Sequence, residues 1–256
     1  MRVLPSRKLA RVVPAPAVSR PARAQRFIEH SAALVLALLS APAAAQVSGN
    51  VALLSDYRYR GVSLTSGKPA AQLGVTYDDP QGWYAGGSLS AVLAGCWEQC
   101  GGLQGVAYAG YATQLASGLT LDGGGDYRFG AADNDYRFGE AYVGLIYRDS
   151  SARVHYAPDY YGKSVNAAYA ELNQSFPLGN SARLLAHVGW LRTGPGPGRY
   201  GIPSATRTDV LLGGSIDVQS FEPQMTWQHA TALATAYPAY AKERRSAWVF
   251  VVSRAF

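Results

Sequence analysis

The charged residues of this chain recur at alternate positions, and this spacing places them on one face of a strand. Arg58 and Arg60 are two residues apart, as are Asp126 and Arg128, and aromatic residues lie between the members of each pair. Successive side chains of a β-strand point to opposite faces, so charges two apart share a face. Opposed charges that line a closed sheet impose a transverse field on passing solutes.

The charges that this alternation assigns to an inward face are of mixed sign. They are Asp56, Arg58, Arg60, Asp122, Asp126, Arg128, Glu140, Arg148, Glu171, Arg183, Asp209 and Asp217. Such a set can line an open channel, or its members can pair with one another as a salt-bridged plug. A barrel of intermediate size fits both interpretations, so the sequence leaves them open.

The histidines do not form a recognisable catalytic motif. A hydrolase needs a nucleophile, a base and an orienting group within reach of one another. Beyond residue 45 the chain has His155, His187 and His229, and it contains no G-x-S-x-G sequence. His187 is predicted to face inward, but its nearest serine, Ser181, lies six residues away on the same strand. We therefore expect no enzyme and no cofactor; a lipid-modifying enzyme is the less favoured alternative.

The chain has two cysteines, Cys96 and Cys100, and they lie close together. In an exported protein such a pair usually forms a disulfide. A metal site would need further ligands nearby, and Glu98 is the one candidate between them. The pattern predicts a disulfide-pinned loop, which could also serve an adhesive surface, and no metal.

The first 45 residues have the composition of a secretory signal. Residues 1–30 hold seven basic residues and one acidic residue, a short apolar run follows at 31–40, and Ala43 to Ala45 suits a signal peptidase. Cleavage after Ala45 leaves residues 46–256 with 23 − 7 = 16 basic and 17 − 1 = 16 acidic residues. The remaining chain is neutral overall, so we expect no nucleic-acid partner.

From residue 46 onward, apolar and polar residues alternate in segments of about ten residues, which is typical of membrane strands. No segment there is long and apolar enough to be a transmembrane helix. The sequence predicts an all-β fold, a transmembrane antiparallel up-and-down β-barrel of about twelve strands. The predicted strands are 47–59, 70–77, 83–92, 103–113, 119–129, 136–148, 152–157, 165–176, 181–192, 207–218, 221–228 and 245–256.

The last strand and the connections support a barrel over a soluble sandwich. Trp248, Phe250, Val252 and Phe256 share one face, as in the C-terminal strands that the barrel-assembly machinery recognises in outer-membrane proteins. Arg254 on the same face departs from that pattern and can snorkel. Connections after even-numbered strands are shorter than the others, which is the asymmetry between periplasmic turns and outer loops.

The stretch VSGNVALLSDYRYRG, residues 47–61, resembles the opening of a bacterial family of porin-like proteins, the TorF family. The resemblance implies a barrel in the outer membrane of Gram-negative bacteria, surrounded by lipid, with a pore role and no catalytic residues. The expected function is a porin-like channel for passive diffusion of small hydrophilic solutes or ions. The alternative is a plugged structural or adhesive barrel.

Overall fold

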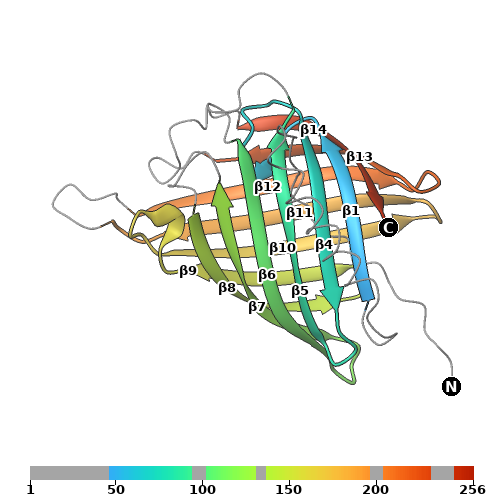
Figure 1. Cartoon of the computed structure of the whole chain (residues 1–256), viewed down its shortest axis with the longest axis horizontal. Coiled ribbons are helices and arrows are strands. Elements are labelled where there is room, and N and C mark those ends of the chain that lie inside the picture. The colour runs from blue at the N-terminus through green and yellow to red at the C-terminus, as the bar shows by residue number, and fades with distance from the viewer. Residues whose placement is uncertain (1–45, 94–101, 131–136, 197–203, 232–244) are drawn as a thin grey trace, which may run out of the picture.

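Twelve long antiparallel strands close into a single barrel in the computed structural model, which describes residues 46–93, 102–130, 137–196, 204–231 and 245–256 (Figure 1). The predicted fold class is confirmed. The strands of the barrel are β1 (Gln46–Leu54), β4 (Ala70–Asp78), β5 (Trp83–Val92), β6 (Leu103–Gln114), β7 (Thr120–Gly130), β8 (Arg137–Tyr147), β9 (Ser150–Ala157), β10 (Ala167–Leu178), β11 (Ala182–Thr193), β12 (Ala205–Ile216), β13 (Glu222–Ala230) and β14 (Ser246–Ala255).

The barrel closes by pairing its first strand with its last. β1 pairs with β14 in the register Val51 to Arg254 and Leu53 to Val252, and with β4 on its other side. Gly49 and Phe256 exchange backbone hydrogen bonds of 2.8 and 2.9 Å at the end of this seam. Closure leaves no free sheet edge, which is what a backbone surrounded by hydrocarbon requires.

The outer face of the barrel is apolar. Trp83 is 60% exposed, Val143 62% and Leu53 58%, whereas Gln72 and Ser90, on the opposite face of their strands, are buried. A continuous exposed surface of this kind is stable against lipid and not against water. Trp248, Phe250, Val252 and Phe256 all lie on this outer face, as the alternation predicts. The described residues contain no helix long and apolar enough to cross a membrane.

The connections differ at the two ends of the barrel, as expected. One end carries the short turns, through residues 79–82, 115–119, 148–149, 179–181 and 217–221. The other end, here called the long-loop end, carries the remaining connections, including residues 55–69 and 158–166. The predicted signal segment 1–45 and the predicted Cys96–Cys100 disulfide lie outside the described residues.

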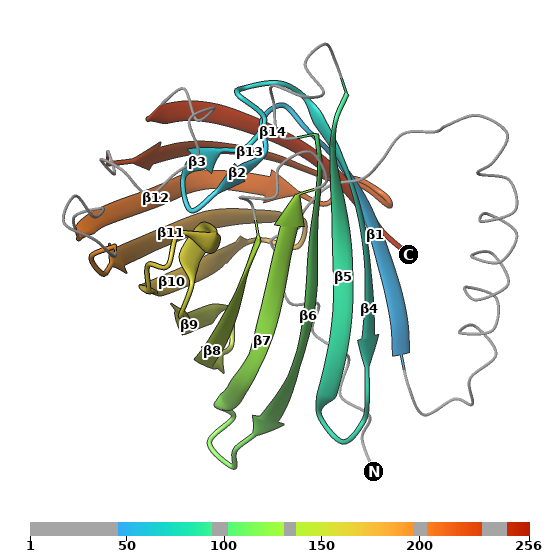
Figure 2. The same ribbon diagram turned by 60° about the vertical axis from the view of Figure 1, so that its left-hand side comes forward.

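The first strand of the barrel is shorter than the predicted strand 47–59. β1 ends at Leu54, and the chain then folds into a small hairpin made of β2 (Arg58–Tyr59) and β3 (Val62–Ser63). In Figure 2 this hairpin leaves the end of β1 and extends toward β12 and β13. A Cβ atom on Gly61 at its tip would lie 2.5 Å from the Cβ atom of Ala230 on β13.

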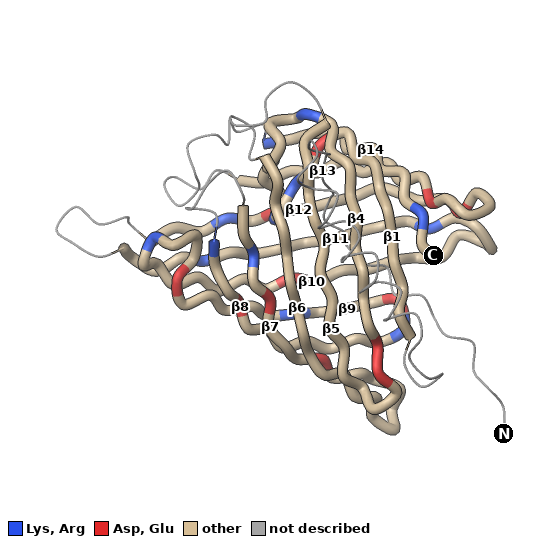
Figure 3. Tube along the Cα trace, in the orientation of Figure 1, with Lys and Arg blue, Asp and Glu red and all other residues tan. Residues whose placement is uncertain are grey.

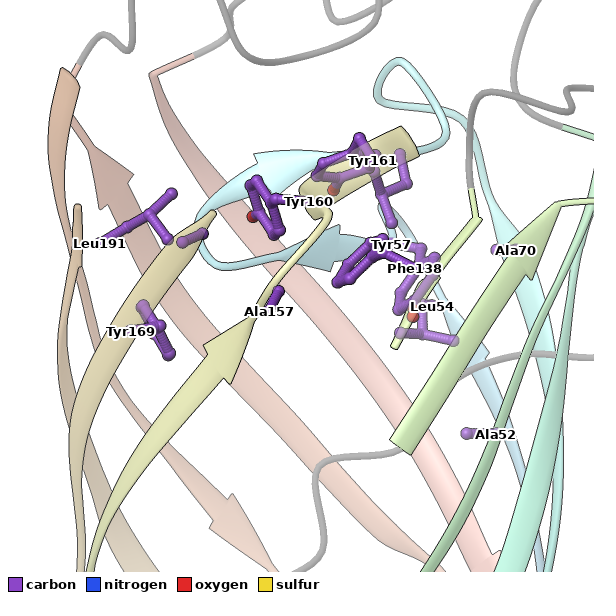
Figure 4. Packing of buried hydrophobic residues seen from close by; sticks show 12 residues of the cluster. Ala52, Leu54, Tyr57, Ala70, Phe138, Ala157, Tyr160, Tyr161, Tyr169 and Leu191 are labelled. Carbon is purple, nitrogen blue, oxygen red and sulfur yellow. The ribbon is translucent and has the colours of Figure 1, made fainter. Parts of the chain in front are cut away.

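A buried apolar cluster fills the barrel where the hairpin enters it (Figure 4). Tyr57 and Leu64 come from the hairpin segment, and Phe138 comes from β8. Tyr160 and Tyr161 come from a 3-10 turn, η1 (Tyr160–Gly162), between β9 and β10. The Phe138 ring lies 4.9 Å from that of Tyr160 and 4.7 Å from that of Tyr161. The core of this protein therefore lies inside the barrel, at the long-loop end.

Candidate functional site

The inserted hairpin is a folded element and not a loose loop. The Asp56 carboxylate accepts hydrogen bonds from the hydroxyls of Ser63 and Thr65 and from Arg58, the latter two at 3.0 Å. Tyr57 donates its backbone N–H to the Thr65 hydroxyl at 3.0 Å. Asp56 is thus the internal anchor that holds both arms of the hairpin together.

The hairpin turns through Arg60 and Gly61, and both have positive φ angles, 49° and 74°. Positive φ at both central positions is the type I′ form of a two-residue hairpin turn, which favours Asn or Gly at these positions. Arginine at the first position costs roughly 1–2 kcal/mol of backbone strain. Strained positions persist where the surrounding contacts enforce them, so the partners of Arg60 decide what this turn is for.

Arg60 is held by Glu140 on the opposite wall of the barrel. Its guanidinium donates two hydrogen bonds, of 2.8 and 2.7 Å, to the two carboxylate oxygens of Glu140 on β8. Both side chains are almost completely buried, at 3% and 1% exposed. Tyr59 adds a third hydrogen bond to Glu140, at 3.0 Å. Burial raises the pKa of Tyr59 well above its ordinary value, so this phenol keeps its proton and remains the donor.

Cation–π contacts extend this latch across the lumen. The guanidinium of Arg128 lies 4.1 Å from the centre of the Tyr59 ring, and that of Arg60 lies 4.7 Å from the same ring. Arg60 also lies 4.0 Å from the ring centre of Tyr169 on β10. The Tyr169 hydroxyl donates to Asp209 on β12 at 3.0 Å. A bar of alternating guanidinium groups and rings therefore runs from β7 to β12.

Behind this bar, carboxylates and imidazoles alternate on five neighbouring strands. His155 lies 4.0 Å from Glu140 and 3.4 Å from Glu171, measured between ring nitrogen and carboxylate oxygen. His187 lies 3.9 Å from Glu171 and 3.4 Å from Asp209. We call these five residues, from β8 to β12, the acidic row; its carboxylates outnumber its imidazoles.

One group of residues has the spacing of a metal site, but its neighbours disfavour a metal. Asp126, Glu140 and His155 offer ligand atoms within 4.8 Å of one another. Arg60 already binds both oxygens of Glu140, and Arg128 lies 3.1 Å from Asp126. Two guanidinium groups at this distance neutralise the carboxylates and repel a metal ion. We assign no metal to this group.

Toward the short turns, large lumen side chains lie flat along the wall. A Cβ atom on Gly110 would collide with the Tyr84 hydroxyl, and one on Gly124 would lie 2.7 Å from the hydroxyl of Tyr142. The two hydroxyls are 2.6 Å apart, and Tyr84 also donates to Asp122. Each ring occupies the space that a missing side chain leaves on the next strand. The tyrosines therefore line this part of the lumen without crossing it.

The charges inside the barrel are concentrated on one half of its wall, as the colours of Figure 3 help to show. β7 to β12 carry Asp122, Asp126, Arg128, Glu140, Arg153, Glu171, Arg207 and Asp209, which are at least half-buried. The facing strands β4 to β6 present uncharged groups such as Gln72, Thr76, Ser88, Ser90 and Gln104. The hairpin starts beside the uncharged half and inserts its arginine into the charged half.

The predicted lumen charges fall into three places. Asp122, Asp126, Arg128, Glu140, Glu171 and Asp209 lie on the inner wall, while Asp56, Arg58 and Arg60 reach the lumen from the hairpin and not from a strand of the barrel.

The remaining three lie at the short-turn end. Arg183 pairs there with Asp217 at 3.2 Å and with Glu222 at 3.5 Å, and these side chains are partly exposed. Arg148 is exposed in the turn after β8, over the ring of Tyr147, so the expected lumen position is wrong for it. Asp217 follows the end of β12 and is likewise outside the lumen.

Several lumen residues were not predicted from the sequence. Arg153 donates a hydrogen bond to Asp122 at 2.8 Å. Arg153 and His155 are two residues apart on β9 and therefore share a face, and this spacing is the sequence signal that could have identified both as lumen residues. The lumen tyrosines Tyr84, Tyr142 and Tyr169 were missed because aromatic residues in a barrel sequence suggest the lipid interface. Each of their hydroxyls lies over a glycine of a neighbouring strand, Gly110, Gly124 and Gly189 respectively, and this feature distinguishes the two roles.

A serine–histidine contact lies on the outer wall. His229 and Ser246 are paired across β13 and β14, with 2.7 Å between Nδ1 and the hydroxyl. The imidazole stacks on Trp227, and within the described part of the chain no carboxylate contacts its other nitrogen. This pair lacks the orienting group of a catalytic triad.

Comparisons with known proteins agree with this architecture. Residues 40–256 match the family described as "Bacterial protein of unknown function (Gcw_chp)", so the expected TorF name is not confirmed. No curated protein matches the sequence.

Among solved structures, the NanC porin is similar with a TM-score of 0.53 and 13% identity, over 82% of this chain and 99% of that one. The KdgM porin has a TM-score of 0.46 and 10% identity, over 82% of this chain and 99% of that one. An outer membrane channel from Pseudomonas putida F1 has a TM-score of 0.46 and 10% identity, over 85% of this chain and 97% of that one. At 13% identity, the NanC match shows that the two proteins share a fold.

Proposed function

This chain belongs to the Gcw_chp family, and we propose that it is an outer-membrane, porin-like channel for passive diffusion of small hydrophilic solutes or ions. In this proposal the short turns face the periplasm, and the hairpin constricts the lumen near the cell exterior. Lipid surrounds the apolar outer face. The strand β14, with Trp248 and Phe250 outward, is the expected contact for the barrel-assembly machinery.

One observation carries the proposal: the polar inner wall of the short-turn half keeps its large side chains flat. Tyr84 and Tyr142 rest over Gly110 and Gly124 instead of meeting in the centre. A barrel whose only task was structural would gain stability from a lumen filled by interdigitating side chains. A wall that keeps its rings out of the centre favours a water-filled passage, which the hairpin narrows at one end.

The test is conduction by the refolded protein. We expect single-channel currents in planar bilayers and uptake of small sugars by liposomes that contain the protein. Reversal potentials in a salt gradient would then give the ion selectivity. The matched control is the same preparation kept unfolded before addition, because detergent and contaminants would remain while the barrel would not.

A plugged structural or adhesive barrel is the second candidate, because one observation favours it. The buried aromatic cluster of Tyr57, Phe138, Tyr160 and Tyr161 occupies the lumen at the long-loop end. The two candidates separate on variants that release the hairpin. A plugged barrel gives no current even when Glu140 no longer holds Arg60, whereas a constricted channel gives a larger current. The His229–Ser246 pair has no orienting carboxylate among the described residues, so it gives no support to a hydrolase.

A further inference from the structure

The hairpin places one side chain, Arg60, in a site that the barrel wall builds. The wall supplies the Glu140 carboxylate, with both oxygens engaged at 2.8 and 2.7 Å, and the ring of Tyr169 at 4.0 Å. The ring of Tyr160 lies 5.9 Å away. A carboxylate that accepts a planar fork and a ring that covers its face are the two features that recognise a guanidinium group.

The charge of the wall around this site is suited to a planar cation once Arg60 has left, because the other guanidinium beside it, that of Arg128, is paired with Asp126 at 3.1 Å. Without the hairpin, the acidic row presents Glu140, Glu171 and Asp209, with the imidazoles of His155 and His187 between them. The two histidines already face these carboxylates from β9 and β11. An incoming planar cation would therefore meet Glu140 and the ring of Tyr169, which hold Arg60 now, in the field of the other carboxylates of the acidic row.

The backbone of Arg60 shows that this placement is enforced. A non-glycine residue at φ 49° is strained, and the residue beside it, Gly61, is packed against the Cβ atoms of Ala230 and Asp209. An arginine is retained in a turn position where asparagine or glycine would be relaxed. The strain is offset by the contacts that its guanidinium makes with the wall.

We propose that Glu140, Tyr169 and the acidic row form a binding site for planar cations of the guanidinium class, and that Arg60 occupies this site as an intramolecular ligand. A solute that carries such a group displaces Arg60 and thereby unseats the hairpin. The binding site stands on its own geometry; the passage of these solutes rests on the proposed channel function.

The binding test uses the complete refolded barrel in detergent and isothermal titration calorimetry. The ligand is arginine methyl ester, and the control ligand is citrulline methyl ester, an isostere with the same α-amino group and an uncharged side chain. We expect the Arg60→Ala variant to prefer the arginine ester by at least about tenfold, because charged hydrogen bonds are replaced by neutral ones with citrulline. Wild type should bind the arginine ester more weakly than Arg60→Ala, since the tethered Arg60 competes at high effective concentration.

Second-site variants locate the binding. Adding Glu140→Gln to Arg60→Ala should abolish the preference for the arginine ester, whereas adding Arg183→Ala at the exposed short-turn rim should leave it unchanged. Arg60→Lys keeps the charge but loses the planar fork, so its affinity for the ester should lie between those of wild type and Arg60→Ala. Circular dichroism and heat-modified electrophoretic mobility confirm that each variant is folded.

The outcomes separate the binding site from the channel. Equal binding of both esters by Arg60→Ala, or a preference that survives Glu140→Gln, overturns the site even if every variant conducts. Selective binding by Arg60→Ala together with the absence of current from all variants supports the site and refutes the channel. Currents through Arg60→Ala that arginine methyl ester interrupts, and citrulline methyl ester does not, support both.

Discussion

At the scale of single residues, the protein depends on one buried ion pair that crosses its interior. Arg60 and Glu140 are nearly inaccessible, and both oxygens of the carboxylate are used. Removing one partner of such a pair leaves the other charge buried and uncompensated, which costs about 3–5 kcal/mol. The rearrangement with the lowest free-energy cost is movement of the hairpin into water, because the hairpin is not part of the barrel wall.

We therefore expect Glu140→Gln to raise the single-channel conductance several-fold relative to wild type. The amide keeps the shape of the side chain but loses the charge that holds Arg60. Asp217→Asn is the matched control, because it removes a carboxylate from an exposed pair with Arg183. An unchanged current for Glu140→Gln would mean that the apolar and cation–π contacts of the hairpin hold it without this charge.

Gly61 gives a second residue-scale prediction, since it combines a φ of +74° with close contact to the wall. In Gly61→Ala the new Cβ atom would lie 2.5 Å from Ala230 and 2.9 Å from Asp209, so the hairpin tip cannot seat. Gly179 has a φ of +72°, and a Cβ atom added there would have no neighbour within 4 Å, which makes Gly179→Ala the control. Both variants should lose roughly 1–2 kcal/mol of stability in heat or denaturant unfolding, the backbone cost of alanine at positive φ, and Gly61→Ala should lose more than Gly179→Ala because the contacts of the hairpin tip are lost as well.

Only Gly61→Ala should also change the current, toward larger openings. If Gly179→Ala changed the current equally, the effect would come from backbone strain in general, and the seating of the hairpin on β12 and β13 would not matter.

At the scale of elements, the strands could be predicted and the hairpin could not. Alternation gave the twelve barrel strands and their outward faces, because the period of two is fixed by strand geometry. The same alternation continues through Asp56, Arg58 and Arg60, so it cannot distinguish a longer β1 from a hairpin folded inward. Arg60-Gly61 is the local turn signal, and it is weak because arginine is unusual there.

The contacts across the lumen could not be predicted from the sequence either. Arg60 and Glu140 are 80 positions apart, and which strands face each other across the barrel depends on its size and stagger. The packing of Tyr84 over Gly110 and of Tyr142 over Gly124 depends on the register between neighbouring strands. Alternation alone does not determine that register.

Replacing the hairpin tests its role as an element. A variant in which residues 57–64 are exchanged for a short glycine-serine linker should keep the barrel folded and conduct more than Glu140→Gln. The barrel should survive because β1 and β4 pair along their whole length without the hairpin. Far-UV circular dichroism checks the fold, and liposome swelling with sugars of increasing size measures the gain in pore width. An unaltered size limit would show that the constriction lies elsewhere.

At the scale of the whole molecule, stability depends on the match between the apolar outer wall and lipid. Val143 lies in the middle of β8 and is 62% exposed, and Val47 lies near the end of β1 on the same outer face. Val143→Arg should destabilise the barrel in bilayers by about 2–4 kcal/mol, and Val47→Arg by no more than about 1 kcal/mol. Urea unfolding in lipid vesicles, followed by tryptophan fluorescence, measures both. Equal losses would argue against a membrane midplane at the level of Val143.

The reach of the hairpin also sets an order of events during folding. Arg60 binds a strand 80 residues away, and the tip contact from Gly61 to Ala230 spans 230 − 61 = 169 residues. Both contacts need an assembled wall, because Arg60 binds β8 and Gly61 packs against β13, so the hairpin docks only after these strands have paired. We expect the newly assembled barrel to leak until Arg60 docks, and refolding into dye-loaded vesicles should then release dye in a burst that stops when the hairpin is seated.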